Sequence, residues 1–133
     1  TIDGVITPVS EFAFTSDKLM THTRKLIEEL NPKYFYIENP KSCLRNLPFF
    51  ADIPRHTVTY CQYGESNMKP TDIWTNHPNP KFKEPCKHGA PCHTYATTGM
   101  RSGTQSVRSS KVKSKIPDLL AKQVAEVSII NGN

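Results

Sequence analysis

The chain lacks any run of the roughly 20 apolar residues that a membrane-spanning helix requires. Its first residues do not form the apolar centre of a signal peptide, because Asp3 and Glu11 interrupt them. We therefore expect an intracellular protein with no membrane partner. Thiols stay reduced inside cells, so the four cysteines are interpreted as metal ligands or buried thiols rather than as disulfides.

The chain is also poor in glycine, and one segment is poor in acids. Its six glycines include no G-x-G pair of the kind that binds nucleotide-like cofactors after a strand. Residues 81–115 hold eight Lys or Arg against Glu84 alone, within a net charge of +5. This excess favours DNA or another polyanion as partner, while a solvated, flexible segment explains it equally well. The candidate phosphate-contacting residues are Arg101, Arg108, Lys111, Lys113 and Lys115.

The chain does have enough apolar residues, 36%, for one packed core. We predict a single α/β domain over residues 1–133, with much loop because prolines number eleven. Residues 1–76 are predicted to form an α/β core with an antiparallel hairpin. Residues 77–115 are predicted to form a basic loop, which a zinc ion bound to the ligands described below would hold in place. A C-terminal helix is predicted over 116–131.

The order of elements in the N-terminal part predicts a partial, Rossmann-like sheet with flanking helices. Residues 3–7 read as a strand, 16–30 as a helix capped by Thr15 or Ser16, and 33–39 as a second strand. A strand, helix and strand in this order predict parallel strands whose carboxyl ends lie side by side. The apolar periodicity predicts that one helix face is buried, namely Leu19, Thr23, Leu26, Ile27 and Leu30.

Residues 56–64 and 71–76 alternate polar and apolar side chains and predict a hairpin. The long loop that follows contains "CKHGAPCH". Cys86, Cys92 and His93 are three soft or borderline donors of the kind that zinc prefers, and Cys61 in the hairpin is a credible fourth. His88 and His77 are reserve ligands. A Cys86–Cys92 disulfide, or two buried thiols with exposed histidines, explains the same spacing, so these alternatives stay open.

Three stretches carry a resemblance to a known family. "LIEELNPKYFYIENPKSCLRNLPFF", "RHTVTYCQYGESNMKPTDIWTN" and "PCKHGAPCH" resemble the central and C-terminal parts of short, phage-type cytosine-5 DNA methyltransferases. The similarity covers roughly residues 19–130. It implies that Glu38 holds the target cytosine, that Asn39 braces the turn and that Arg55 positions the base. Methyl transfer in that family begins with attack by a Pro-Cys thiolate.

The chain departs from the family pattern at the nucleophile. The family's Pro-Cys loop matches "ITPVSEF", so the cysteine position falls on Val9, and no cysteine precedes Cys43. The glycine-rich turn that binds S-adenosylmethionine is missing too, so this cofactor is not expected without a partner. The leading hypothesis is therefore a degenerate methyltransferase-like protein, inactive alone, that acts as a nucleic-acid-binding or assembly component. The alternatives are one part of a split active enzyme and a purely structural protein-interaction subunit.

Overall fold

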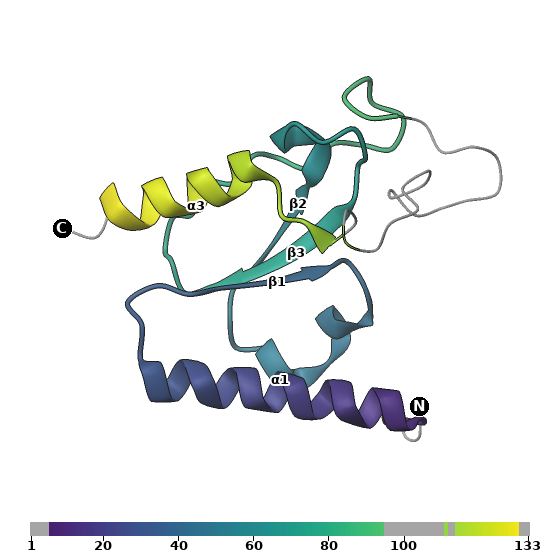
Figure 1. Ribbon diagram of the computed structural model, residues 1–133, viewed down its shortest axis with the longest axis vertical. Coiled ribbons are helices and arrows are strands. Elements are labelled where there is room, and N and C mark those ends of the chain that lie inside the picture. The colour runs from purple at the N-terminus through teal and green to yellow at the C-terminus, as the bar shows by residue number, and fades with distance from the viewer. Residues whose placement is uncertain (1–5, 95–110, 112–113, 131–133) are drawn as a thin grey trace.

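The computed structural model describes residues 6–94, 111 and 114–130. They form three layers, with helix α1 (Glu11–Leu30) below a small sheet and helix α3 (Asp118–Ile130) above it (Figure 1). The sheet contains strands β1 (Tyr36–Pro40), β2 (Arg55–Thr59) and β3 (Pro70–Thr75). The described residues also form three short 3-10 helices. In the sequence, η1 (Cys43–Asn46) and η2 (Pro48–Phe50) lie between β1 and β2, and η3 (Tyr60–Tyr63) follows β2. The α/β class is thus confirmed in its coarse form.

Helix α1 begins earlier than its apolar periodicity predicts. Ser10 is its N-cap, since the Ser10 Oγ accepts a hydrogen bond from the Ala13 N–H at 3.1 Å. The predicted caps at Thr15 and Ser16 are wrong, because both hydroxyls donate to carbonyls four residues back inside the helix. The predicted end is confirmed: Asn31 adopts a left-handed conformation (φ 43°) and Pro32 follows.

The sheet order is β1-β3-β2, and both pairs are antiparallel. The predicted hairpin is confirmed as β2 and β3, although β2 ends at Thr59 and the next residues turn into η3. The predicted parallel arrangement is wrong for the described part of the sheet, because β3 returns alongside β1. The proposed parallel neighbour, residues 3–7, lies mostly outside the described residues, and Ile6 and Thr7 are not in a strand.

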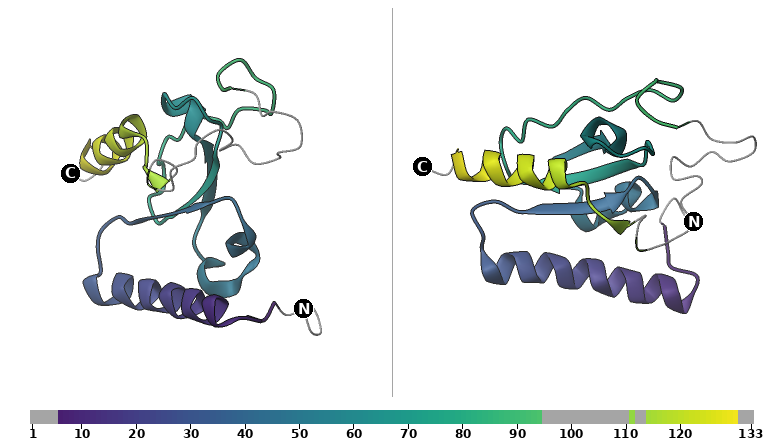
Figure 2. Two further views of the ribbon diagram at one scale, coloured as in Figure 1. Left: turned by 45° about the vertical axis from the view of Figure 1, so that its right-hand side comes forward. Right: turned by 45° about the horizontal axis from the view of Figure 1, so that its top comes forward.

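Each face of the sheet carries its own apolar cluster, since successive strand residues point to opposite faces. Val58 and Ile73 pack under α3 with Leu120 and the two tyrosines of η3. On the other face Trp74 packs against Leu44 and Phe50, which η1 and η2 supply. The right-hand view of Figure 2 shows the sheet between α3 and α1. The chain therefore has a core that is thin but two-sided.

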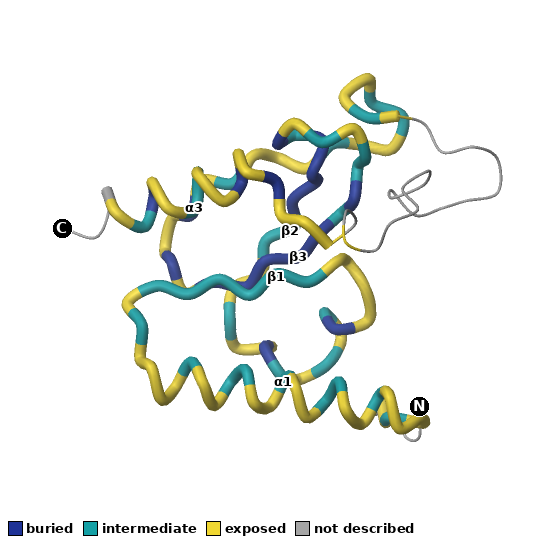
Figure 3. The backbone as a smooth tube through the Cα atoms, in the orientation of Figure 1, coloured by how far each residue is buried: buried dark blue, intermediate teal, exposed yellow. Residues whose placement is uncertain are grey.

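The apolar face that periodicity predicts for α1 is not the buried one. Leu19, Leu26 and Leu30 are exposed, only Thr23 and Ile27 of the predicted face are half-buried, and none of the twenty helix residues is fully buried (Figure 3). The side chain that reaches the lower cluster is Met20. The pattern located the helix correctly but not its more covered side, because α1 packs mainly against η2, which the periodicity of the helix does not record.

An ion pair links η1 to the sheet. The Arg45 Nε donates to Asp72 Oδ2 at 2.9 Å, and a second guanidinium nitrogen contacts Oδ1. Thr57 donates its hydroxyl to the same carboxylate at 2.8 Å. Burial acts to raise the pKa of Asp72, but the hydrogen bonds from Arg45 and Thr57 outweigh it and hold that pKa below its usual range.

Neither α1 nor α3 is long and apolar enough to span a membrane.

Candidate metal centre

The first part of the predicted loop, residues 77–94, has no helix or strand, yet hydrogen bonds attach it to β2, to η3 and to the turn after η3. The Lys83 N–H donates to the Tyr63 hydroxyl at 2.9 Å, and the Cys86 N–H donates to the Thr59 hydroxyl at 2.9 Å. Farther along, the Thr94 N–H donates to the Ser66 carbonyl at 2.8 Å. These contacts hold the loop beside η3, at the end of β2. We call residues 83–94 the Cys/His loop.

Four soft or borderline donors converge where the Cys/His loop meets η3. Cys61 comes from η3, and Cys86, Cys92 and His93 come from the loop. Their ligand atoms all lie within 4.8 Å of one another. These are the four residues that the sequence singled out for zinc, so the grouping is confirmed.

Four of the six distances between these ligand atoms can be compared with those around a tetrahedral ion. With zinc bonds of about 2.3 Å to sulfur and about 2.0 Å to nitrogen, a regular tetrahedron has S–S edges of about 3.8 Å and S–N edges of about 3.5 Å. The Nδ1 of His93 lies 3.5 Å from the Sγ of Cys86 and 3.6 Å from that of Cys92. The Sγ of Cys61 lies 3.6 Å from that of Cys92 and 3.1 Å from that of Cys86. Three of these four edges match within about 0.2 Å, and the fourth, between Cys61 and Cys86, is about 0.7 Å too short, so these two sulfurs would have to move apart to bind the ion.

The alternative of a disulfide does not describe this group. All four cysteines of the chain are free, including Cys86 and Cys92, and the 3.1 Å between the Cys61 and Cys86 sulfurs far exceeds a bond of about 2.05 Å. Cys61 is buried while Cys92 is exposed, so an ion can reach the group from the Cys92 side.

The pKa values of two cluster thiols are shifted in opposite directions. Burial, with hydrogen bonding to Cys86, raises the pKa of Cys61 to about 12. For Cys86, burial acts in the same direction, but hydrogen bonds from Thr59 and Cys61 prevail and lower its pKa. A metal ion would keep all coordinating thiols ionised, because its charge favours the thiolate strongly.

The two reserve histidines lie outside the ligand group. The ring of His88 is 6.5 Å from that of His93, centroid to centroid. His77 is buried elsewhere, with its Nδ1 accepting a hydrogen bond from the Asn79 N–H and its ring against Tyr34 at 4.3 Å. Cys43 stands apart on η1 and is exposed.

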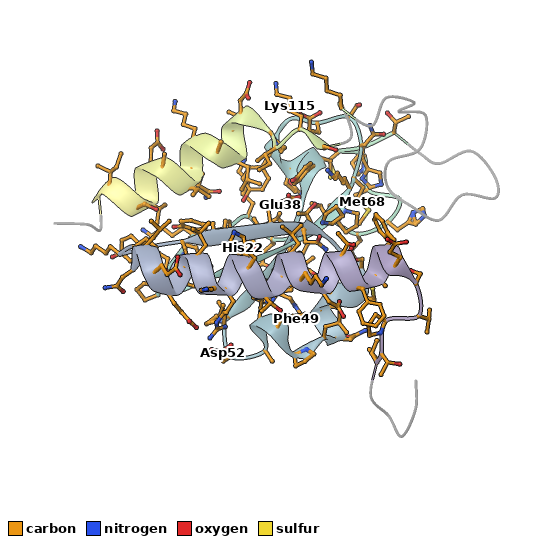
Figure 4. The ribbon with its side chains drawn as sticks, turned by 60° about the horizontal axis from the view of Figure 1, so that its bottom comes forward. His22, Glu38, Phe49, Asp52, Met68 and Lys115 are labelled. Carbon is orange, nitrogen blue, oxygen red and sulfur yellow. The ribbon has the colours of Figure 1, made fainter. Side chains whose placement is uncertain are left out.

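The residues of the expected base-binding site do not form one group. Glu38 stands opposite Ile73 on the α3 side of the sheet, where it accepts a hydrogen bond from Tyr60 at 2.9 Å. Arg55 stands opposite Trp74 and so points to the other face. In Figure 4 the Glu38 side chain lies on the α3 side of β1. A base held by Glu38 would therefore not meet Arg55 without rearrangement.

The other two members of that expected site are placed as follows. Asn39 donates to the Ser42 hydroxyl at 3.1 Å and to the Pro40 carbonyl, which braces the turn after β1. Val9, at the nucleophile position, is 92% exposed just before α1.

The candidate phosphate-contacting residues are only partly described. Arg101, Arg108 and Lys113 lie outside the described residues. Lys111 and Lys115 are exposed, and Lys115 forms an ion pair with Asp118 at 3.5 Å.

Sequence reasoning missed the residues that support the cluster and Glu38. Thr59 positions Cys86, and Tyr60 donates to Glu38. Burial raises the pKa of Tyr60 and Glu38 adds to the effect, so this phenol stays a hydrogen-bond donor. Both residues immediately precede Cys61, and no local pattern distinguishes them from ordinary strand residues.

No family model, curated protein or solved structure matches this chain.

Proposed function

We propose that this chain is a zinc-stabilised, methyltransferase-like module that binds nucleic acid or joins an assembly, and that it does not transfer methyl groups alone. The observation that carries the proposal is the convergence of Cys61, Cys86, Cys92 and His93. This cluster attaches the Cys/His loop to η3. Residues 101–115, which carry five Lys or Arg and which we call the basic run, follow that loop in the sequence. The metal would fix where that run leaves the fold.

Four protein donors and no apparent vacant position are typical of a structural zinc site rather than a catalytic one. When bound, zinc would supply folding free energy to a loop that has no regular secondary structure. The hydrogen bonds from Cys86 to Thr59 and from Thr94 to Ser66 already pre-arrange this loop, which reduces the ordering cost of binding.

The charge distribution supports a polyanionic partner. Lys81, Lys87 and Lys111 are exposed beside or beyond the cluster, and Lys83 folds back to donate to the Gln62 carbonyl. If the five basic side chains of 101–115 each contact one duplex phosphate, the slope of log affinity against log salt should be about −4.5.

The distribution of thiols supports the absence of methyl transfer. The reaction needs a thiolate near the base, and the cysteine position is occupied by Val9. Three of the four cysteines belong to the cluster. Cys43 lies on η1, which packs on the face opposite to Glu38.

Metal analysis of the purified chain, paired with two substitutions, tests the zinc part. Wild type and Cys43→Ser should each hold one zinc per chain, and Cys61→Ser should hold markedly less. The two variants exchange the same atoms, so they differ only in whether the thiol belongs to the cluster. Zinc at trace level in wild type, or equal content in both variants, would rule the site out.

DNA retention measured at several salt concentrations tests the nucleic-acid part. Wild type and Cys43→Ser should bind with a steep salt slope, and Cys61→Ser should bind more weakly because the basic run has lost its anchor. Binding with no salt slope, or none at all, contradicts this part. Transfer of label from S-adenosylmethionine to cytosine-containing DNA above background would contradict the inactive state.

A further inference from the structure

Helix α1 leaves a row of large apolar side chains in solvent. Phe12, Leu19, Leu26 and Leu30 are 82, 57, 43 and 69% exposed. Steps of seven, seven and four residues place them on one flank of the helix, along about 27 Å. We call these four residues the apolar flank. A contiguous row of this length is typical of an interaction surface, whereas single exposed apolar residues are not.

The apolar flank faces away from η2 and toward the open side of β1. Arg24, which contacts Asp52 and the Phe49 carbonyl, stands five residues after Leu19 and so about 140° around the helix. Figure 4 shows Phe49 and Asp52 on one side of α1 and β1 on the other. The flank and the outer side of β1 therefore belong to one face of the molecule, the one that Figure 1 shows from the front.

Strand β1 ends the described sheet, and its outer edge carries backbone groups with no strand partner among the described residues. The Lys41 N–H donates to the Pro70 carbonyl at 2.9 Å. Because antiparallel ladders alternate, Asn39 and Ile37 also bond toward β3. The backbone N–H and C=O groups of Tyr36 and Glu38 then point outward, a template for a further strand.

We propose that this face binds a second copy of the chain, related by a twofold axis perpendicular to the sheet. Such an axis pairs β1 with its own copy in antiparallel orientation, which continues the all-antiparallel sheet to six strands. The same axis brings the apolar flank of one α1 against that of the other. A second copy thus provides hydrogen-bond partners for the outer edge of β1 and covers the apolar flank of α1.

The residues of β1 select one register for this pairing. Centring the axis on Glu38 would set two carboxylates opposite each other and pair Tyr36 with Pro40, which has no N–H to donate. Centring it on Ile37 pairs Tyr36 with Glu38 of the second copy twice, so both outward N–H groups find an acceptor. Ile37 then faces its own copy at the close spacing of a non-hydrogen-bonded pair.

Light scattering of the zinc-loaded full chain tests the association. The mass should rise with concentration from 15.0 kDa toward twice that value, in about the micromolar range because one helix and one strand make a small interface. The double variant Leu19→Glu, Leu26→Glu should remain a monomer with unchanged circular dichroism. Ile129→Glu on α3 is the control: Ile129 is also an exposed apolar residue, and its variant should still dimerise.

A wild-type mass of 15.0 kDa at every concentration would overturn the proposal and leave the face to a different partner. Equal loss of the dimer in the Ile129→Glu control would also overturn it. The register is tested with Ile37→Cys in a Cys43→Ser background, zinc-loaded so that the cluster thiols are protected. Mild oxidation should trap a covalent dimer, whereas a dimer that is never trapped contradicts the register.

Discussion

Replacing Asp72 with asparagine tests the ion pair buried between η1 and the sheet. The side chain of Asp72 is 1% exposed and that of Arg45 is 21% exposed. The substitution keeps the shape of the carboxylate but removes its charge. It also turns an amide group toward the donors of Arg45 and Thr57, which now point at Asp72.

The expected loss in the free energy of unfolding depends on the charge of Arg45, which stays partly buried after the substitution. Breaking a buried ion pair by removing one partner costs about 3–5 kcal/mol, because the other charge stays buried without compensation. Arg45 keeps some solvent and a 3.1 Å hydrogen bond to Thr57, so the lower end, about 3 kcal/mol, is expected. With a urea dependence of about 2 kcal/mol per molar, the unfolding midpoint should fall by about 1.5 M.

A second ion pair in the same chain provides the control. Arg24 contacts Asp52 with the same two-pronged geometry, but this pair is more open to solvent, with Arg24 33% and Asp52 63% exposed. Asp52→Asn should barely move the midpoint, because solvent already weakens that interaction. Urea unfolding of both variants, followed by circular dichroism at pH 7 with equal zinc, makes the comparison.

Equal midpoints for the two variants would refute the reasoning, since burial is the main difference between the pairs. A double-mutant cycle with Arg45→Met adds a second check. If the costs of Arg45→Met and Asp72→Asn simply add, the two residues do not interact in the folded state.

Three further predictions concern the same fold. The folded pKa of Asp72 is lowered, so its contribution is present at pH values above the unfolded pKa of about 4 and is lost as the pH falls through the folded pKa. The stability gap between wild type and Asp72→Asn, measured by urea unfolding from pH 7 to pH 3, should therefore narrow on acidification, and a constant gap would contradict the shift. Leu120→Ala should cost about 2–5 kcal/mol because this side chain is buried in the upper cluster. Leu119→Ala, at its exposed neighbour, should be nearly neutral by the same assay, and similar costs would contradict the described core. Gly64→Ala should lose about 1–2 kcal/mol because Gly64 has φ of 92° at the end of η3; a variant as stable as wild type in thermal unfolding would show that this turn can relax.

Local patterns were sufficient for several elements of this protein. Alternation located β2 and β3, and the "NP" at 31–32 marked the end of α1. The donor chemistry of the Cys/His loop identified three members of the group that could hold a metal. Cys61 was added because a hairpin should lie beneath that loop, and the structure places it there. These predictions depend on spacing and side-chain chemistry, which a linear sequence records directly.

Other features depend on which surfaces meet. The helical period of α1 gives its apolar rows but not the row that η2 covers, so Met20 packs inward while Leu19 stays exposed. The order strand, helix, strand indicated parallel pairing, but β3 pairs with β1 in the antiparallel sense. Glu38 and Arg55 suit one base chemically, yet the register directs them to opposite faces.

The sequence by itself determined that this chain has an α/β core, a hairpin and a Cys/His set able to hold a metal, because period, turn chemistry and ligand type are local properties. Only the tertiary structure decided the strand order, the edge position of β1 in the described sheet and the exposed flank of α1. Each of these features depends on which segments, far apart in the chain, pack against one another, and local sequence patterns do not record that choice.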